Sequence, residues 1–196
     1  MKLLIFSLLV IIACSSLAFA QTDNWTEYNT KGKSLAYGLD ATVKIPPDFI
    51  SSSPIEGVLM EYTRPYAGSD VEKSGTYLTL AFIPDNSIPV YYQTEHGVWD
   101  EELVNTGLEA LVSRFTGLQD YIITMDTDFP FVDMQLKHIP EGRNKRYRDI
   151  DARLILTDNM IVKLECGDFS EVQEEVNHAD QLETVCIPFF SSFIIK

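Results

Sequence analysis

Apolar and polar residues alternate in several short stretches of this chain, a pattern typical of β-strands that bury one face and expose the other. Residues that favour turns separate these stretches, for example Pro46 and Pro47 after the first of them. We expect strands at residues 41–45, 57–64, 76–83, 121–125, 132–137, 150–156 and 161–166. The last two lie on either side of Thr157-Asp158-Asn159, and this short connection predicts a β-hairpin.

The spacing of apolar residues changes between Asp100 and Gly117. Apolar side chains recur there at helical intervals, at positions 104, 108, 111, 115 and 118. Asp100, Glu101 and Glu102 place negative charge at the start of this segment, where a helix dipole favours it, and Gly117 suits a C-terminal cap. The pattern predicts a helix over residues 100–117.

The N-terminus has the pattern of a secretion signal. Lys2 precedes about a dozen apolar residues, too few to span a bilayer, and Ala18-Phe19-Ala20 is a small-x-small cleavage site. We therefore expect a signal peptide at 1–20, a single domain at 21–196, and a periplasmic or secreted location. The alternative is a membrane-tethered lipoprotein, because Ile11-Ile12-Ala13 before Cys14 resembles a lipobox that would place a lipid anchor on Cys14.

Two further cysteines, Cys166 and Cys186, are expected to form a disulfide in an oxidising compartment, worth about 3 kcal/mol on the chain-entropy model. An unbroken helix from Glu171 would carry Cys186 about 22 Å along its axis, too far for a bond that needs Cα atoms within about 7 Å. If the pair forms, the last helix must begin later, near Asn177, and fold back over the final strand. Pro188 adds a kink. The apolar residues that close the chain should be buried: Phe189, Phe190, Phe193 and Ile195.

Strands, one long helix, more strands and a terminal helix predict an α+β domain in which helices flank an antiparallel β-sheet. This order, with its strand-Cys-loop-Cys-helix ending, resembles the PsbP-like superfamily. The resemblance is carried by residues 37–49, by the helix at 100–117 and by residues 191–195. It implies an α/β/α sandwich, found also in small exported bacterial proteins, and a non-enzymatic role as an accessory, binding or assembly factor. It assigns no functional residue.

The formal net charge is −14 at pH 7, and one unit more negative without Lys2. Such a chain repels nucleic acid and anionic lipid and attracts a basic partner, although acidity also simply keeps an exported protein soluble. One basic run interrupts the acidity and is a candidate partner-binding surface: Arg143, Lys145, Arg146 and Arg148. A solvated hairpin tip explains that run equally well.

Catalytic motifs are not found. The sequence has neither the Gly-x-Ser-x-Gly of a nucleophile elbow nor a glycine-rich phosphate loop. The histidines that could act as bases are His96, His138 and His178, and two of them sit beside turns, where an ordinary surface histidine is the default. We expect no catalytic residue and no cofactor.

Metal sites are weakly indicated. Glu174 and His178 lie one helical turn apart but lack a third zinc ligand. Residues 126–128 together with Asp133 offer oxygen ligands for calcium, without the glycine and spaced glutamate of an EF-hand loop. We expect no metal.

These observations favour an exported, periplasmic, non-enzymatic domain that binds another protein, as an accessory factor or as an inhibitor or immunity protein. The alternative is a periplasmic hydrolase that uses carboxylates or a bound metal. A small-ligand carrier is a third class, which requires a large apolar pocket between sheet and helix.

Overall fold

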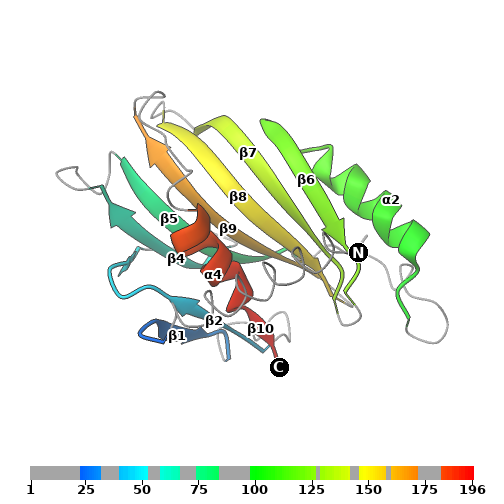
Figure 1. Ribbon diagram of the computed structural model, residues 1–196, viewed down its shortest axis with the longest axis horizontal. Helices are drawn as coiled ribbons and strands as arrows, with labels where there is room; N and C mark the ends of the chain where they lie inside the picture. Colours follow the sequence, from blue (N-terminus) through cyan, green and yellow to red (C-terminus); the bar gives the residue numbers. More distant parts are fainter. Residues whose placement is uncertain are drawn as a thin grey trace, which may run out of the picture.

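The computed structural model describes residues 23–31, 40–52, 58–66, 74–83, 98–126, 129–141, 146–157, 160–171 and 182–196. The predicted leader, its cleavage site and Cys14 lie outside this part of the chain. Strands make up most of it and form two antiparallel sheets (Figure 1). Within the described residues, no helix combines the length and hydropathy needed to cross a membrane.

The large sheet has seven strands in the order β3-β4-β5-β9-β8-β7-β6. In chain order these are β3 (Ile50–Ser51), β4 (Val58–Pro65), β5 (Ser74–Ile83), β6 (Leu118–Thr124), β7 (Phe131–Glu141), β8 (Arg146–Leu156) and β9 (Ile161–Ser170). The alternating patterns located six of these strands, and the predicted hairpin is confirmed, because Leu156 pairs with Ile161 across the β8–β9 turn.

The small sheet has the order β1-β2-β10 and consists of β1 (Thr26–Asn29), β2 (Ala41–Ile45) and β10 (Ile194–Ile195). It packs with the apolar residues of β5 and β9 in one core. Lys44 of β2 donates its backbone N–H to the hydroxyl of Ser192, which fixes the C-terminal segment beside this sheet.

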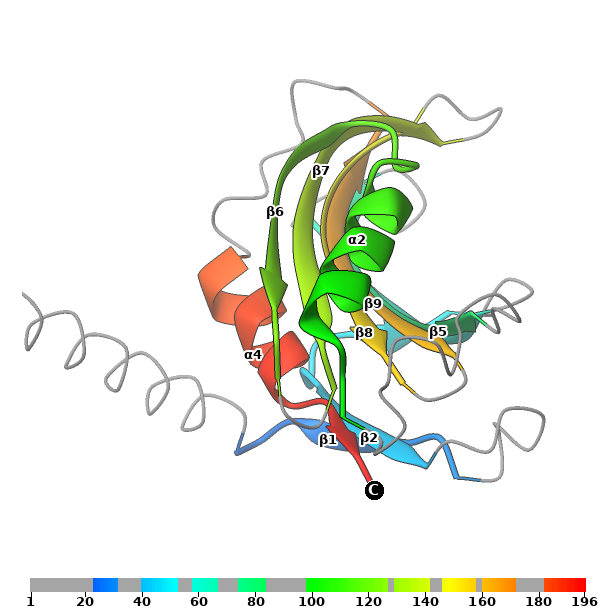
Figure 2. The ribbon, with the colours of Figure 1, turned by 90° about the vertical axis from the view of Figure 1, so that its right-hand side faces the viewer.

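Helix α2 (Glu101–Val112) lies against one face of the large sheet (Figure 2). Its buried residues Val104, Leu108 and Val112 pack on the apolar side chains of β7 and β8. The Asp100 carboxylate accepts a hydrogen bond from the Leu103 N–H at 3.0 Å and caps the N-terminus, as the acidic start of the segment indicated.

The helix predicted over 100–117 ends early, at Val112. Ser113 is its C-cap, and Gly117 lies beyond the helix in a turn with φ of 76°, a conformation that glycine adopts without strain. Leu118, which continues the helical spacing of apolar residues, is the first residue of β6. The apolar spacing therefore overestimated the helix, because it cannot distinguish one more helical turn from a turn into a strand.

Helix α4 (Ile187–Ser191) follows the π-helical turn η4 (Leu182–Cys186) and lies against the opposite face of the large sheet (Figure 2). We call this face the α4 face. The predicted disulfide is confirmed: Cys166 of β9 is bonded to Cys186, with the two Cα atoms 5.4 Å apart and both residues fully buried. It ties the start of α4 to the sheet. The predicted start of a helix near Asn177 lies outside the described residues.

The remaining C-terminal predictions are partly met. Phe189 and Phe190 are buried, whereas Phe193 and Ile195 are only half-buried. Pro188 lies in the first turn of α4, where its missing N–H removes no helical hydrogen bond.

The predicted α+β class, an antiparallel sheet flanked by helices in an α/β/α sandwich, is wrong. The described chain is predominantly β-structure in two antiparallel sheets, with two short helices that each cover only part of a face. The main reason is the C-terminus: after Ser192 the chain leaves α4, and Ile194 and Ile195 pair with β2. A second sheet thus covers area on the α4 face that a terminal helix was expected to cover.

Candidate functional site

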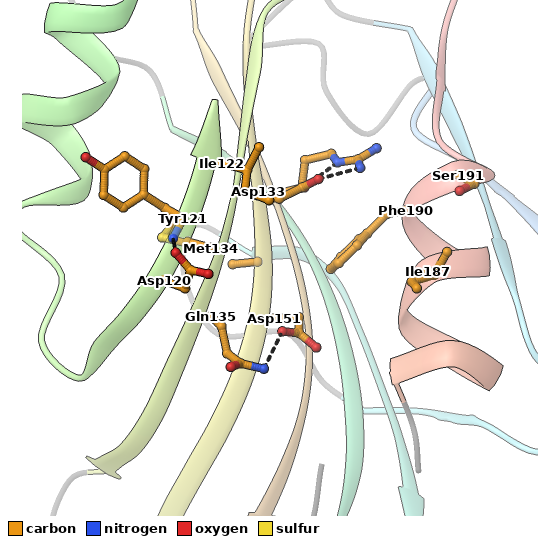
Figure 3. Close-up of a pocket in the computed structure, with 12 residues that line it drawn as sticks. Asp120, Tyr121, Ile122, Asp133, Met134, Gln135, Asp151, Ile187, Phe190 and Ser191 are labelled. Atoms are coloured by element: carbon orange, nitrogen blue, oxygen red, sulfur yellow. Dashed lines mark hydrogen bonds and ion pairs between the residues drawn. The ribbon is translucent and has the colours of Figure 1, made fainter. Parts of the chain in front are cut away.

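A groove is present on the α4 face between the end of the large sheet and helix α4 (Figure 3). Its volume is about 280 Å³. The lining consists of residues 120–122 of β6, 133–135 of β7, 151–153 of β8, and 187, 190 and 191 of α4. One wall is therefore sheet and the other is helix.

The register of strands β6, β7 and β8 brings together the polar side chains of the sheet wall. Asp133 pairs with Arg153 on one side and with Ile122 on the other. Two residues along β7, Gln135 pairs in the same way with Asp151 and Asp120. Because residues two apart on a strand point to the same face, these two rows lie next to each other on the α4 face.

The first row holds a fixed ion pair. The Arg153 guanidinium donates to both carboxylate oxygens of Asp133, at 2.7 and 2.8 Å. The same guanidinium lies 4.2 Å from the ring centroid of Phe131 and 5.6 Å from that of Phe190. Bidentate pairing and stacking on aromatic rings both restrict the side chain, so Arg153 marks a defined point in the groove.

The second row makes one end of the groove acidic. Asp151 is only 8% exposed and accepts a long hydrogen bond, 3.4 Å, from the side-chain amide of Gln135. Asp120 is exposed, and its carboxylate accepts the backbone N–H of Tyr121 at 2.8 Å. Two carboxylates on strands β6 and β8 thus stand on either side of Gln135.

Apolar side chains edge the same groove. Ile122 on β6 is 66% exposed and Ile187 on α4 is 44% exposed, and the two lie on opposite sides of the groove (Figure 3). Phe190 points from α4 toward the sheet. Both walls of the groove therefore carry an apolar side chain that is exposed to water.

A second depression of about 280 Å³ adjoins the first, since both are lined by Arg153 and Phe190. It is richer in aromatic and aliphatic residues, with Asp126 as its carboxylate. Its apolar lining comprises Phe129, Phe131, Ile155, Phe190, Phe193, Ile194 and Ile195. We call the two depressions together the α4 groove, with an acidic end at Asp151 and an aromatic end at Phe131.

A separate polar cluster lies further along the α4 face. Thr76 donates its hydroxyl hydrogen bond to Asp168 at 2.8 Å, and Asp149 pairs with Asp168 across β8 and β9. All three are buried. Burial, together with the negative charge of Asp168 and a hydrogen bond to it, raises the pKa of the Tyr66 hydroxyl.

The predicted basic surface is only partly described. Arg143 and Lys145, and the side chain of Arg146, lie outside the described residues. The Arg148 guanidinium lies 4.5 Å from the ring centroid of Tyr77, whose ring belongs to the core on the α2 side. The structure therefore does not bring Arg148 to the α4 groove, and a role for the basic run stays a prediction.

Most of the residues considered for catalysis and for zinc lie outside the described part of the chain. These are His96, Glu174 and His178, together with the side chain of His138. Of the calcium candidates, Asp133 is bound by Arg153 and Asp126 lines the aromatic end of the groove. Across the described ranges, His, Cys, Asp and Glu residues form no group of three or more that could hold a metal ion.

The α4 groove itself was missed by the sequence analysis. Its acidic residues, Asp120, Asp133 and Asp151, lie on three different strands, and only the register of the sheet brings them together. A usable signal was present in β8, where Asp151 and Arg153 occupy alternate positions between apolar residues. That alternation marks one charged and one buried face of the strand.

No protein-family model matches this sequence, and no curated protein sequence matches it. Among solved structures, the chain is similar to PsbP from the cyanobacterium Synechocystis, with 10% identity, a TM-score of 0.48 and coverage of 88% of this chain and 92% of that chain. It is also similar to the Ran-binding protein Mog1p of Saccharomyces cerevisiae, with 10% identity, a TM-score of 0.43 and coverage of 87% and 94%.

A likeness to a PsbP structure is what the sequence resemblance led us to expect. It is a likeness of fold between chains that are 10% identical, and no site or partner is carried over from it. The sandwich of helices and sheet that the resemblance implied is the part corrected above.

Proposed function

We propose that this protein is an exported, non-enzymatic binding domain whose α4 groove holds a basic segment of a partner protein. The observation that carries the proposal is the groove itself, in which apolar side chains exposed to water flank a row of carboxylates. Apolar anchors surrounded by polar groups are the usual composition of protein-binding surfaces.

Charge favours a basic partner. The lining of the first depression carries Asp120, Asp133 and Asp151 against Arg153, and the whole chain has a formal charge of −14. Opposite charges on two partners raise the rate of encounter and suppress binding of acidic competitors. An accessory factor that recognises a basic segment fits this groove, as does an inhibitor or immunity protein that blocks a basic enzyme or toxin.

The shape of the groove favours a chain segment over a small molecule. A small-ligand pocket encloses most of its ligand, about 70–90% of the ligand surface. Here the walls are open enough to leave Ile122 at 66% and Ile187 at 44% exposure. An extended segment that lies along the groove would cover both residues.

Export is supported by the disulfide between Cys166 and Cys186, because such bonds persist mainly in oxidising compartments. The signal-like N-terminus predicts the same location, in the periplasm or outside the cell. Attachment of a lipid at Cys14 is the alternative form of the same exported protein.

The test is site-specific crosslinking in extract of the native host. A photoreactive amino acid replaces Ile122 in the groove, and in a matched control replaces Leu103, which is 46% exposed on α2 on the other side of the sheet. We expect a protein adduct at position 122 that is absent at position 103 and is lost as the salt concentration rises. No adduct at 122, or equal adducts at both positions, would overturn the proposal.

A further inference from the structure

The two ends of the α4 groove differ in chemistry and lie a fixed distance apart. On β7, Gln135 lies at the acidic end and Phe131 at the aromatic end. On β8, Asp151 and Ile155 repeat this arrangement. Each pair is separated by four residues on one strand, so each lies on one face at a spacing of about 13 Å, at 3.3 Å per residue.

The ion pair of Arg153 with Asp133 lies near the point where the two depressions meet. Because this pair is neutral overall, it offers a cationic side chain of a partner little net attraction. The carboxylates of Asp120 and Asp151 attract the same side chain to the acidic end. The aromatic end also contains Asp126, but most of its lining is aromatic or aliphatic, which suits an apolar side chain.

Spacing favours an extended segment over a helix. Each depression has a volume of about 280 Å³, enough for one or two large side chains, so a bound segment inserts side chains while its backbone lies over the groove. A helix rises only 1.5 Å per residue, so residues four apart would be about 6 Å apart along its axis. In an extended chain, residues four apart point to the same side and are separated by about 13 Å, which is the spacing of the two ends.

We propose that the partner segment binds in an extended conformation and presents a lysine or arginine to Asp151 and Asp120. A large apolar side chain four positions away enters the aromatic end between Phe131 and Phe190. This inference rests on the proposed function and specifies the chemistry of the partner.

The test uses synthetic peptides on a serine-glycine scaffold, each with one arginine and one leucine separated by two to six positions, in both orders. Affinity for the mature, disulfide-bonded protein is measured by NMR titration at low ionic strength. We expect the tightest binding at a spacing of four. Spacings of three and five should bind at least about fivefold more weakly, because one of the two side chains then points away from the groove.

Two variants with equal loss of charge identify the cation site. Asp151→Asn should weaken binding of the spacing-four peptide about tenfold, since a charged hydrogen bond is lost, and should not change binding of a peptide with norleucine in place of arginine. The norleucine peptide also reports whether the variant is folded. Glu183→Gln, at an exposed site outside the groove lining, should bind as the wild type does.

The outcomes separate this inference from the proposed function. Equal binding at every spacing, or a preference for a spacing of three, would overturn the extended register and leave a protein-binding groove intact. Absence of binding by every peptide would also overturn the inference, and crosslinking at Ile122 then decides whether the groove has a partner at all.

Discussion

The two halves of the α4 face share one row of paired residues but differ in what covers them. In the β5–β9 half, Leu80 pairs with Leu164, and both are fully buried under the small sheet and α4. In the other half the same row of paired residues continues with the charged Arg153 and Asp133, and it ends at Ile122, which is exposed. The covered half stabilises the fold, and the open half contributes less to stability and is accessible to a partner.

The opposite side of the same strands shows that the open half is not simply a poorly packed edge. Val132, Met134, Ala152 and Leu154 on β7 and β8 are all buried against α2. These strands are therefore held firmly from behind, and their charged face is presented on a rigid support. A binding surface on a rigid support loses little conformational entropy when it binds.

The largest expected difference between the two halves is in the free energy of unfolding lost when an apolar residue is replaced by alanine. Leu164→Ala should lower the free energy of unfolding by about 4 kcal/mol, because it leaves a cavity among fully buried residues. Ile122→Ala, in the same row, should lower it by less than about 0.5 kcal/mol. Urea unfolding followed by circular dichroism measures both, and similar losses for the two variants would contradict the division of the face.

Removal of the disulfide by Cys166→Ala with Cys186→Ala should lower the free energy of unfolding by about 3 kcal/mol. The bond anchors the start of α4, so the same double variant should also lose affinity for the spacing-four peptide under conditions where it is still folded. Stability and affinity equal to those of the wild type would show that α4 is held in place without the bond.

The ion pair between Asp133 and Arg153 should contribute less to the free energy of unfolding than the disulfide does. Its partners are partly exposed, so a double-mutant cycle with Asp133→Ala and Arg153→Ala should give a coupling free energy of about 1 kcal/mol. The bidentate geometry is the reason to expect a measurable value. A coupling of zero would mean that the pair does not restrain Arg153 in solution.

The smallest effect concerns the polar cluster at the far end of the same face. The raised pKa of Tyr66 means that the folded protein holds this proton where the unfolded chain, with a pKa of 10.0, releases it. The hydroxyl thus contributes its full stabilisation below pH 10, and the contribution is lost as the pH rises through the folded pKa. The stability advantage of the wild type over Tyr66→Phe should therefore shrink above pH 10 in urea unfolding; an advantage that grows there would contradict the assignment.

Local patterns predicted much of the fold because they report local geometry. Alternation located six of the seven strands of the large sheet, and Asp100 marked the start of α2. The prediction of the end of α2 was wrong because an apolar residue after Gly117, here Leu118, is compatible with a helix or with a strand. The pairing of Ile194 with Thr42 depends on contacts between the two ends of the chain, which no local pattern contains.

The sequence of β8 indicates a charged face, but the groove as a whole could not be predicted, for the same reason. Asp120, Gln135 and Asp151 are separated by 15 and 16 positions in sequence and meet only through the register of β6, β7 and β8. The cysteine pair was predictable because two cysteines in a domain that we expect to be exported leave one intramolecular pairing. Chemistry that depends on the pairing of distant strands requires the structure.

The central claim is that the open half of the α4 face binds a basic partner. The most direct test measures the affinity of groove variants for the partner protein that crosslinks at position 122. Asp120→Asn with Asp151→Asn should weaken this affinity about 100-fold at low salt, since each lost charged contact contributes about tenfold. Glu102→Gln with Glu109→Gln removes the same charge from exposed positions on α2 and should change the affinity less than about twofold. Equal losses for the two double variants, or no loss for the groove variant, would contradict the account.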